Sequence, residues 1–141
     1  MMDKSQIETM LAGKEIDELV AEIVFGESKP VYTHVHDNVF STQWSTEKNW
    51  HCTPEYLNGD VCEWTPKAFS KDISATQEVI TIMTKEPFAW RIESINTEAG
   101  VKWRACLWSD VLNGSITEYS AEADTISLAV SRVALLKCGG V

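Results

Sequence analysis

The sequence predicts an α+β domain in which helices cover a three-stranded antiparallel meander. Residues 88–95 and 101–108 alternate between apolar and polar, the two-residue period of half-buried strands. Asn113-Gly114 is typical of a tight hairpin turn and predicts a third strand running through Tyr119. Because three strands cannot bury their apolar face alone, the predicted helices on either side of them are expected to cover the sheet.

The chain of 141 residues is expected to form a single domain, 1–141, around one hydrophobic core. The hydrophobic fraction of 44% favours a packed core over disorder. No apolar run is long enough to cross a bilayer and no leader pattern opens the chain, so a cytoplasmic protein with no membrane contact is expected. The formal net charge of −9 repels phosphate backbones and argues against nucleic-acid binding.

Two helical segments are predicted at the start of the chain. Ser5-Gln6-Ile7-Glu8 has the spacing of a capping box, and a longer helix is expected from Lys14 to Gly26. The apolar residues of the longer helix recur at i, i+3, i+4 and i+7. They are Ile16, Leu19, Val20 and Ile23. Asp17, Glu18 and Glu22 fall on the opposite side and predict a solvated face.

Segment 27–67 is predicted to be a variable, aromatic-rich insertion after the first helices. It contains all three histidines and three of the six tryptophans. Val31–His36 and Val39–Trp44 are predicted to pair as a hairpin around Asp37-Asn38, and the rest, through Pro66, is predicted to be irregular. A long aromatic loop of this kind is typical of a functional segment.

Two further helices follow the insertion. Ser70 or Asp72 is expected to cap a helix that runs to about Lys85 before Pro87. A last helix is predicted over 123–137, with an apolar face and with Arg132 as a surface charge. That apolar face consists of Ile126, Ala129, Val130, Val133 and Ala134.

Three blocks of the sequence resemble the phage ABA-sandwich family. They are Ala12–Glu22, Phe69–Ala75 and Glu122–Leu136, in that order along the chain. The resemblance implies a phage or prophage origin and an α-β-α sandwich, and it covers most of the chain outside the insertion. It brings no catalytic motif, because the family has no established activity, and so it does not settle function.

Metal and thiol chemistry have limited support. The residue types that bind zinc occur in His34-x-His36, Cys52 and Cys62. These residues are weak candidates because no C-x-x-C knuckle accompanies them, and no metal or other cofactor is expected. The four cysteines are expected to be free thiols. No nucleophile elbow, P-loop or dinucleotide motif occurs, which predicts a protein that is not an enzyme.

Tryptophan and arginine define the predicted ligand site. Trp90 and Trp103 lie on the apolar strand faces and are expected in the core. A pocket would use aromatic walls to stack a planar ring and arginines to pair with its phosphate or carboxylate. The predicted ligand-binding residues are Trp44, Trp50, His51, Trp64, Arg91, Arg104 and Trp108.

These features predict a non-enzymatic phage accessory protein that binds a ligand. The most specific version of this prediction is that the protein captures a small nucleotide-like molecule, a nucleotide-derived host immune signal, as a counter-defence. Aromatics and arginine equally suit a protein–protein interaction module, including a homo-oligomer, that blocks a host factor. A small zinc-stabilised accessory protein is the third alternative.

Overall fold

The computed structural model describes residues 3–28, 43–44, 49–54, 62–84, 88–110 and 116–139. Its helices are α1 (Lys4–Thr9), α2 (Lys14–Leu19) with the π-helical turn η1 (Val20–Val24), α3 (Ile73–Met83) and α4 (Ile126–Cys138). Its strands are β1 (Gln43–Trp44), β2 (Trp50–Pro54), β3 (Cys62–Pro66), β4 (Phe88–Thr97), β5 (Gly100–Asp110) and β6 (Ile116–Ala123). The predicted α+β class is confirmed, with a three-stranded antiparallel sheet packed against helices.

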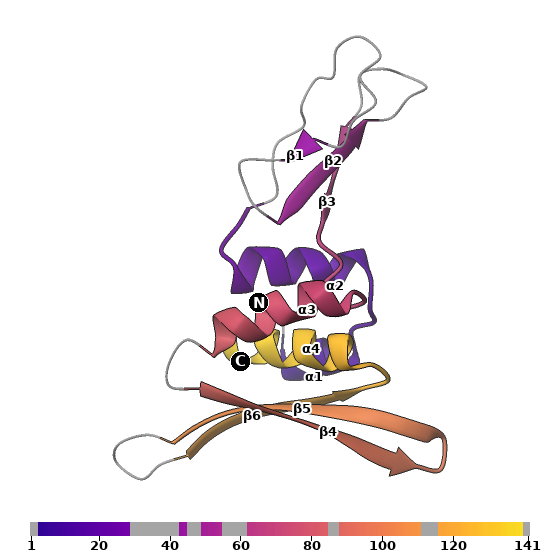
Figure 1. The fold of residues 1–141 in the computed structure, drawn as a ribbon, viewed down its shortest axis with the longest axis vertical. Helices are drawn as coiled ribbons and strands as arrows, with labels where there is room; N and C mark the ends of the chain where they lie inside the picture. Colours follow the sequence, from indigo (N-terminus) through magenta and orange to yellow (C-terminus); the bar gives the residue numbers. More distant parts are fainter. Residues whose placement is uncertain are drawn as a thin grey trace.

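Two separate antiparallel sheets stand at opposite ends of the molecule with the helices between them (Figure 1). The large sheet has the order β4-β5-β6, as the predicted meander requires, and the small sheet has the order β1-β2-β3. An α-β-α sandwich would place helices on both faces of its sheet. Here the described helices all lie on one face of the large sheet, so its other face is not covered by them.

Helix α4 is the centre of the core. It packs on β5 and β6 on one side and on α3, α2 and η1 on the other. Ten consecutive residues, Ser127–Leu136, are therefore buried, where the sequence predicts one apolar face. A helix enclosed by other elements on all sides buries its polar positions too, and helical periodicity does not reveal this.

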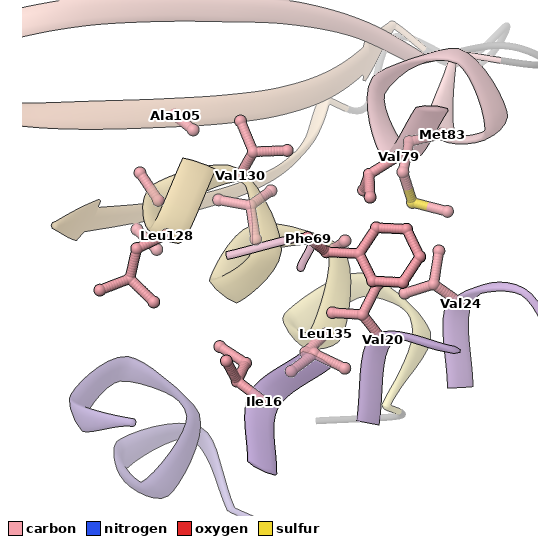
Figure 2. Close-up of a cluster of buried hydrophobic side chains, with 14 of the residues drawn as sticks. Ile16, Val20, Val24, Phe69, Val79, Met83, Ala105, Leu128, Val130 and Leu135 are labelled. Carbon is pink, nitrogen blue, oxygen red and sulfur yellow. The ribbon is translucent and has the colours of Figure 1, made fainter. Parts of the chain in front are cut away.

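Phe69 joins the helices at the other side of the core. Figure 2 shows its ring between Val79 and Met83 of α3 and Val20 and Val24 of η1. Phe69 is fully buried and stacks on Phe25, with ring centroids 5.1 Å apart. The contact fixes the end of the first helical segment against α3.

The capping box of α1 lies two residues earlier than predicted. Asp3, not Ser5, is the N-cap: its carboxylate accepts from the backbone N–H of Gln6, and the Gln6 side chain accepts from the N–H of Asp3, both at 2.9 Å. The Ser5 hydroxyl donates to the same carboxylate. A carboxylate accepts more strongly than a hydroxyl, which accounts for the shift.

The prediction that Asp17 is solvated is wrong. Asp17 is only 4% exposed, and its carboxylate accepts a 2.8 Å hydrogen bond from the backbone N–H of Ser70. The Ser70 hydroxyl in turn accepts from the N–H of Gly13. This bond turns the helix so that Asp17 faces inward, and Ile23, expected in the core, is 38% exposed. The core positions of the segment are Ile16, Val20, Ala21 and Val24.

Arg132 is also buried rather than on the surface, with 8% exposure. Its guanidinium donates to the carbonyl oxygen of Met10 from Nε at 3.1 Å and from Nη2 at 2.7 Å. Nη1 donates to the carbonyl oxygen of Glu122 at 2.7 Å. Arg132 thereby holds the end of α1 and the end of β6 to α4.

The insertion contains the small sheet. β2 and β3 pair antiparallel, from Trp50 opposite Pro66 to Pro54 opposite Cys62, in a stretch predicted to be irregular. β1 pairs with β2 through Gln43 and Trp44. Apart from Gln43 and Trp44, the hairpin predicted over Val31–Trp44 lies outside the described residues.

The other element boundaries differ from prediction by a few residues. Asp72, not Ser70, caps α3, whose last residue is Met83. β6 extends beyond Tyr119 to Ala123, and α4 begins at Ile126 with Thr125 as its N-cap. Asn113-Gly114 lies outside the described residues. No helix in the described ranges has both the length and the apolar composition needed to span a membrane.

The N-cap of α4 gives a first testable prediction. The Thr125 hydroxyl oxygen accepts from the N–H of Leu128 at 3.2 Å. Thr125→Ala should lower the free energy of unfolding by about 1 kcal/mol, because the N–H loses its partner. Urea denaturation measures this. Thr125→Ser keeps the hydroxyl and should retain most of the stability, whereas equal losses in both variants would contradict the capping role.

Candidate functional site

An open groove of about 490 Å³ lies where the insertion meets α3. This volume is in the range of small-molecule sites. One wall comes from the end of the first helical segment and the start of the small sheet, and the other comes from α3. The lining residues are Phe25, Glu27, Asn49, Ser74, Gln77, Glu78, Thr81 and Ile82.

Glu27 organises the first wall. Its carboxylate accepts from the backbone N–H of Asn49 at 2.8 Å and from the Asn49 side-chain amide. Its own carbonyl oxygen accepts from the indole N–H of Trp50 at 3.3 Å. The Glu27–Asn49 contacts therefore close the base of the insertion beside the groove.

Asn49 retains an unused acceptor. The side chain is 1% exposed, and Oδ1 is buried with no hydrogen-bond partner among the described residues. The Asn49 amide nitrogen is bound to Glu27, which fixes the orientation of the side chain. A buried carbonyl oxygen without a donor costs free energy, so such groups are rare outside sites that bind water, ions or ligands.

The α3 wall carries the ion pair between Lys67 and Glu78. Lys67 Nζ lies 3.0 and 2.9 Å from the two carboxylate oxygens of Glu78, and both side chains are partly exposed. The Lys67 backbone N–H donates to the carbonyl oxygen of Asn49, which joins the two walls. Each wall of the groove thus carries one carboxylate: Glu27, bound to Asn49, and Glu78, paired with Lys67.

The predicted tryptophans of the insertion are structural where their side chains are described. Trp50 is fully buried and Trp64 is 6% exposed, so both belong to the hydrophobic core. The backbones of Trp44 and His51 lie opposite each other in the β1–β2 pair. The side chains of these two residues lie outside the described part.

The weak zinc candidates are only partly placed. Cys52 lies opposite Trp64, and Cys62 lies opposite Pro54, on adjacent strands. The side chains of both cysteines, and all of His34 and His36, are outside the described residues. Among the residues that are described, no group of three metal-ligating side chains occurs, and Cys106 and Cys138 are free thiols.

Arg91, Arg104 and Trp108 come together on the uncovered face of the large sheet. Arg104 lies opposite Glu93 on β4 and Glu122 on β6, and it contacts their carboxylates at 3.3 and 3.1 Å. These contacts raise the pKa of Arg104. Arg91 lies 3.7 Å from Glu118. The predicted anion contacts are therefore already paired with the protein's own carboxylates.

Cys106 lies beneath Arg91 on this face, with its sulfur 3.6 Å from the guanidinium. Burial raises the pKa of the Cys106 thiol, although Arg91 acts in the opposite direction. A thiol with a raised pKa is not the thiolate that nucleophilic catalysis requires. The side chain thus packs under the charged surface.

The two halves of the predicted site are far apart. The helices lie between the small sheet, with Trp50 and Trp64, and the large sheet, with Arg91, Arg104 and Trp108 (Figure 1). The two tryptophans expected in the core are half-buried: Trp90 donates its indole N–H to the carbonyl oxygen of Ile80, and Trp103 lies on β5 opposite Ala123, the last residue of β6. Sequence reasoning did not identify the groove, whose walls come from residues far apart in the chain.

Comparison with models of known protein families, with curated proteins and with solved structures found no match.

Proposed function

We propose that this chain is a non-enzymatic binding protein whose ligand occupies the groove between Asn49 and α3. The observation that carries the proposal is a groove of ligand size whose wall contains Asn49, with a buried Oδ1 that has no partner among the described residues. The described lining includes no histidine or cysteine, which fits binding better than catalysis.

The lining indicates the chemistry of the ligand. Phe25, held by its stack on Phe69, and Ile82 offer apolar contact. The carboxylates of Glu27 and Glu78 are acceptors, so the ligand should carry hydrogen-bond donors. A compact, neutral or cationic molecule with a flat or apolar part meets these conditions.

The negative charges of the groove restrict how a nucleotide could bind in it. A base has a flat face and amino donors, as the lining requires, but two carboxylates repel a phosphate. A nucleotide-derived host signal would therefore enter base first, with Lys67 turning from Glu78 to a phosphate. As part of the same proposal, the protein is a phage accessory protein that sequesters this signal in the host cytoplasm.

A groove-filling substitution tests the proposal. Gln77 is exposed on α3 and lines the groove, so Gln77→Trp should fill it without disturbing the core. Calorimetric titration with nucleosides, cyclic nucleotides and polyamines should find a probe whose dissociation constant rises at least about tenfold in the variant. Ile73→Trp adds the same side chain to α3 outside the groove, because Ile73 is 52% exposed and not part of the lining.

The control should bind as the wild type does. If no probe binds the wild-type protein, or if Gln77→Trp binds as tightly as Ile73→Trp, the groove is not the site. Unchanged melting temperatures in both variants would show that any lost affinity is local.

The uncovered face of the large sheet supports a second candidate, a module that blocks a host factor. Trp108 is half-buried beside Arg91 and Arg104, and tryptophan and arginine are common anchors of interfaces. A stoichiometric partner captured from host lysate should be lost with Trp108→Ala and kept with Gln77→Trp. The opposite pattern would assign the partner to the groove.

The zinc alternative is tested by the metal content of protein purified without chelator.

A further inference from the structure

The large sheet has two edge strands, β4 and β6, and β4 is the longer of the two. β4 covers the ten residues Phe88–Thr97 and pairs with β5 alone, in one continuous register from Phe88 opposite Ser109 to Thr97 opposite Gly100. No bulge interrupts that register. On its outer side, the backbone N–H and C=O groups of β4 have no strand partner among the described residues. Such an edge is a template for a further strand.

β4 lacks most of the features that protect an edge strand, although it carries the charges of Arg91 and Glu93. Its sequence, FAWRIESINT, contains no proline, lysine or glycine. α4 packs on β5 and β6, so β4 lies at the margin of the helical layer. The core-facing residues there are only half-buried, namely Phe88, Trp90 and Ile92. The opposite edge differs, because β6 is packed against α4 and a hollow at β6 is lined by Lys4 of α1 and Leu136 of α4.

The charges of β4 are self-complementary in one antiparallel register. If Ile92 lies opposite Ile92 of a second copy, Arg91 of each copy lies opposite Glu93 of the other. Trp90 then faces Ser94, and the core faces of both sheets lie on the same side. Directly opposed side chains of opposite charge stabilise antiparallel pairs, and like charges destabilise them.

Neighbouring registers do not offer this match. A shift by two residues in either direction places Arg91 opposite Arg91, or Glu93 opposite Glu93. A shift by one residue turns the apolar face of one copy to the solvated side of the other. In the matched register, the row Glu122–Arg104–Glu93 across one sheet continues with Arg91 of the second copy, so the signs alternate across the junction.

We propose that β4 pairs antiparallel with β4 of a second copy, centred on Ile92, to form one six-stranded sheet across a twofold axis. The proposal does not depend on the groove or on its ligand. The net charge of −9 on each chain opposes association at low ionic strength, so the pairing should be measured near 150 mM salt, where the screening length is about 8 Å.

Charge exchange tests the register. Sedimentation equilibrium of the full chain should give a dimer for the wild type. Arg91→Glu or Glu93→Arg alone should raise the dimer dissociation constant at least about tenfold, because each opposes like charges twice across the axis. The double variant carrying both substitutions restores opposite charges and should recover the dimer.

Matched controls distinguish the effect of a charge change at the β4 edge from the effect of the same change elsewhere on the sheet face. Lys102→Glu on β5 and Glu122→Arg on β6 make the same charge changes on the same face, away from the edge, and should remain dimeric. Circular dichroism melting of every variant confirms folding. A wild type that is monomeric at about 100 μM overturns the proposal. So does a dimer that both single exchanges leave intact, or a double variant as dissociated as the single ones.

Discussion

Replacing Arg132 by methionine is expected to destabilise the protein by about 3 kcal/mol, because two partly buried carbonyl oxygens lose hydrogen bonds from a charged donor, worth about 1.5–3 kcal/mol each. These are the carbonyl oxygens of Met10 and Glu122, which the guanidinium contacts at 2.7–3.1 Å. Methionine fills similar space but donates no hydrogen bond. For a chain of this size, the melting temperature should fall by roughly 10 °C.

The position of Arg132 makes the loss larger than that of an ordinary arginine. Its bonds join α1, β6 and α4, so the N-terminal helix should loosen before the rest unfolds. Urea denaturation gives the free energy, and hydrogen exchange at residues 4–10 reports the loosening. Lys102→Met on the exposed sheet face is the control and should change stability little. A stable Arg132→Met protein with unchanged exchange in α1 would contradict this account.

Replacing Asp17 by alanine is the second substitution with a large expected effect. The change leaves the buried N–H of Ser70 without its acceptor, and a loss of about 2–3 kcal/mol is expected. Asp17 and Ser70 act as one unit, because both the backbone and the side chain of Ser70 hydrogen-bond the Asp17 carboxylate. In a double-mutant cycle, Asp17→Ala and Ser70→Ala should therefore be clearly non-additive. Additive losses would show that the two side chains act independently.

Asp17 also gives stability a pH dependence of unusual sign. Burial raises the pKa of Asp17, while hydrogen bonds from Ser70 and the charge of Lys71 lower it less. The folded state then binds the proton more tightly than the unfolded chain does. The contribution of Asp17 to stability therefore falls as pH rises from the ordinary aspartate pKa through the raised one, and is constant above it.

Asp17→Asn removes this titration. The stability difference between the wild type and Asp17→Asn should increase in favour of the wild type as pH is lowered through that window. Urea denaturation of both proteins from neutral to acidic pH measures the difference. A difference that shrinks toward acid would mean that the pKa is lowered in the fold.

The sequence predicted the elements whose pattern is local. Alternation at 88–95 and 101–108 gave β4 and β5, because a sheet with one covered face separates Trp90 and Ile92 from Arg91. The sequence pattern gave the wrong location for charged residues that are buried. A helical pattern assigns every charge to the solvent, whereas Asp17 and Arg132 lie inside because backbone groups of distant segments bind them.

The small sheet was missed although its pattern is in the sequence. Trp50-x-Cys52-x-Pro54 and Cys62-x-Trp64-x-Pro66 each alternate over five residues, and they pair in the structure. The prolines suggested breaks, but each stands at the last position of its strand, where its missing N–H does little harm.

The groove could not be predicted from residue types. Glu27, Asn49 and α3 are separated in sequence, and only their packing brings them together. One local signal was available: Asn49 ends the short polar run that begins at Ser45, and a tryptophan follows it directly. Trp50 and Trp64, predicted to line the site, belong to the core instead, because a large indole stabilises a small sheet most when it is buried.

The most direct test of the central claim is native mass spectrometry after incubation with a small-molecule extract of infected bacterial cells. If the groove binds a ligand, the wild type and Ile73→Trp should both carry an excess mass that is lost on denaturation, and Gln77→Trp should not. An equal excess mass on Gln77→Trp, or none on the wild-type protein, would contradict it.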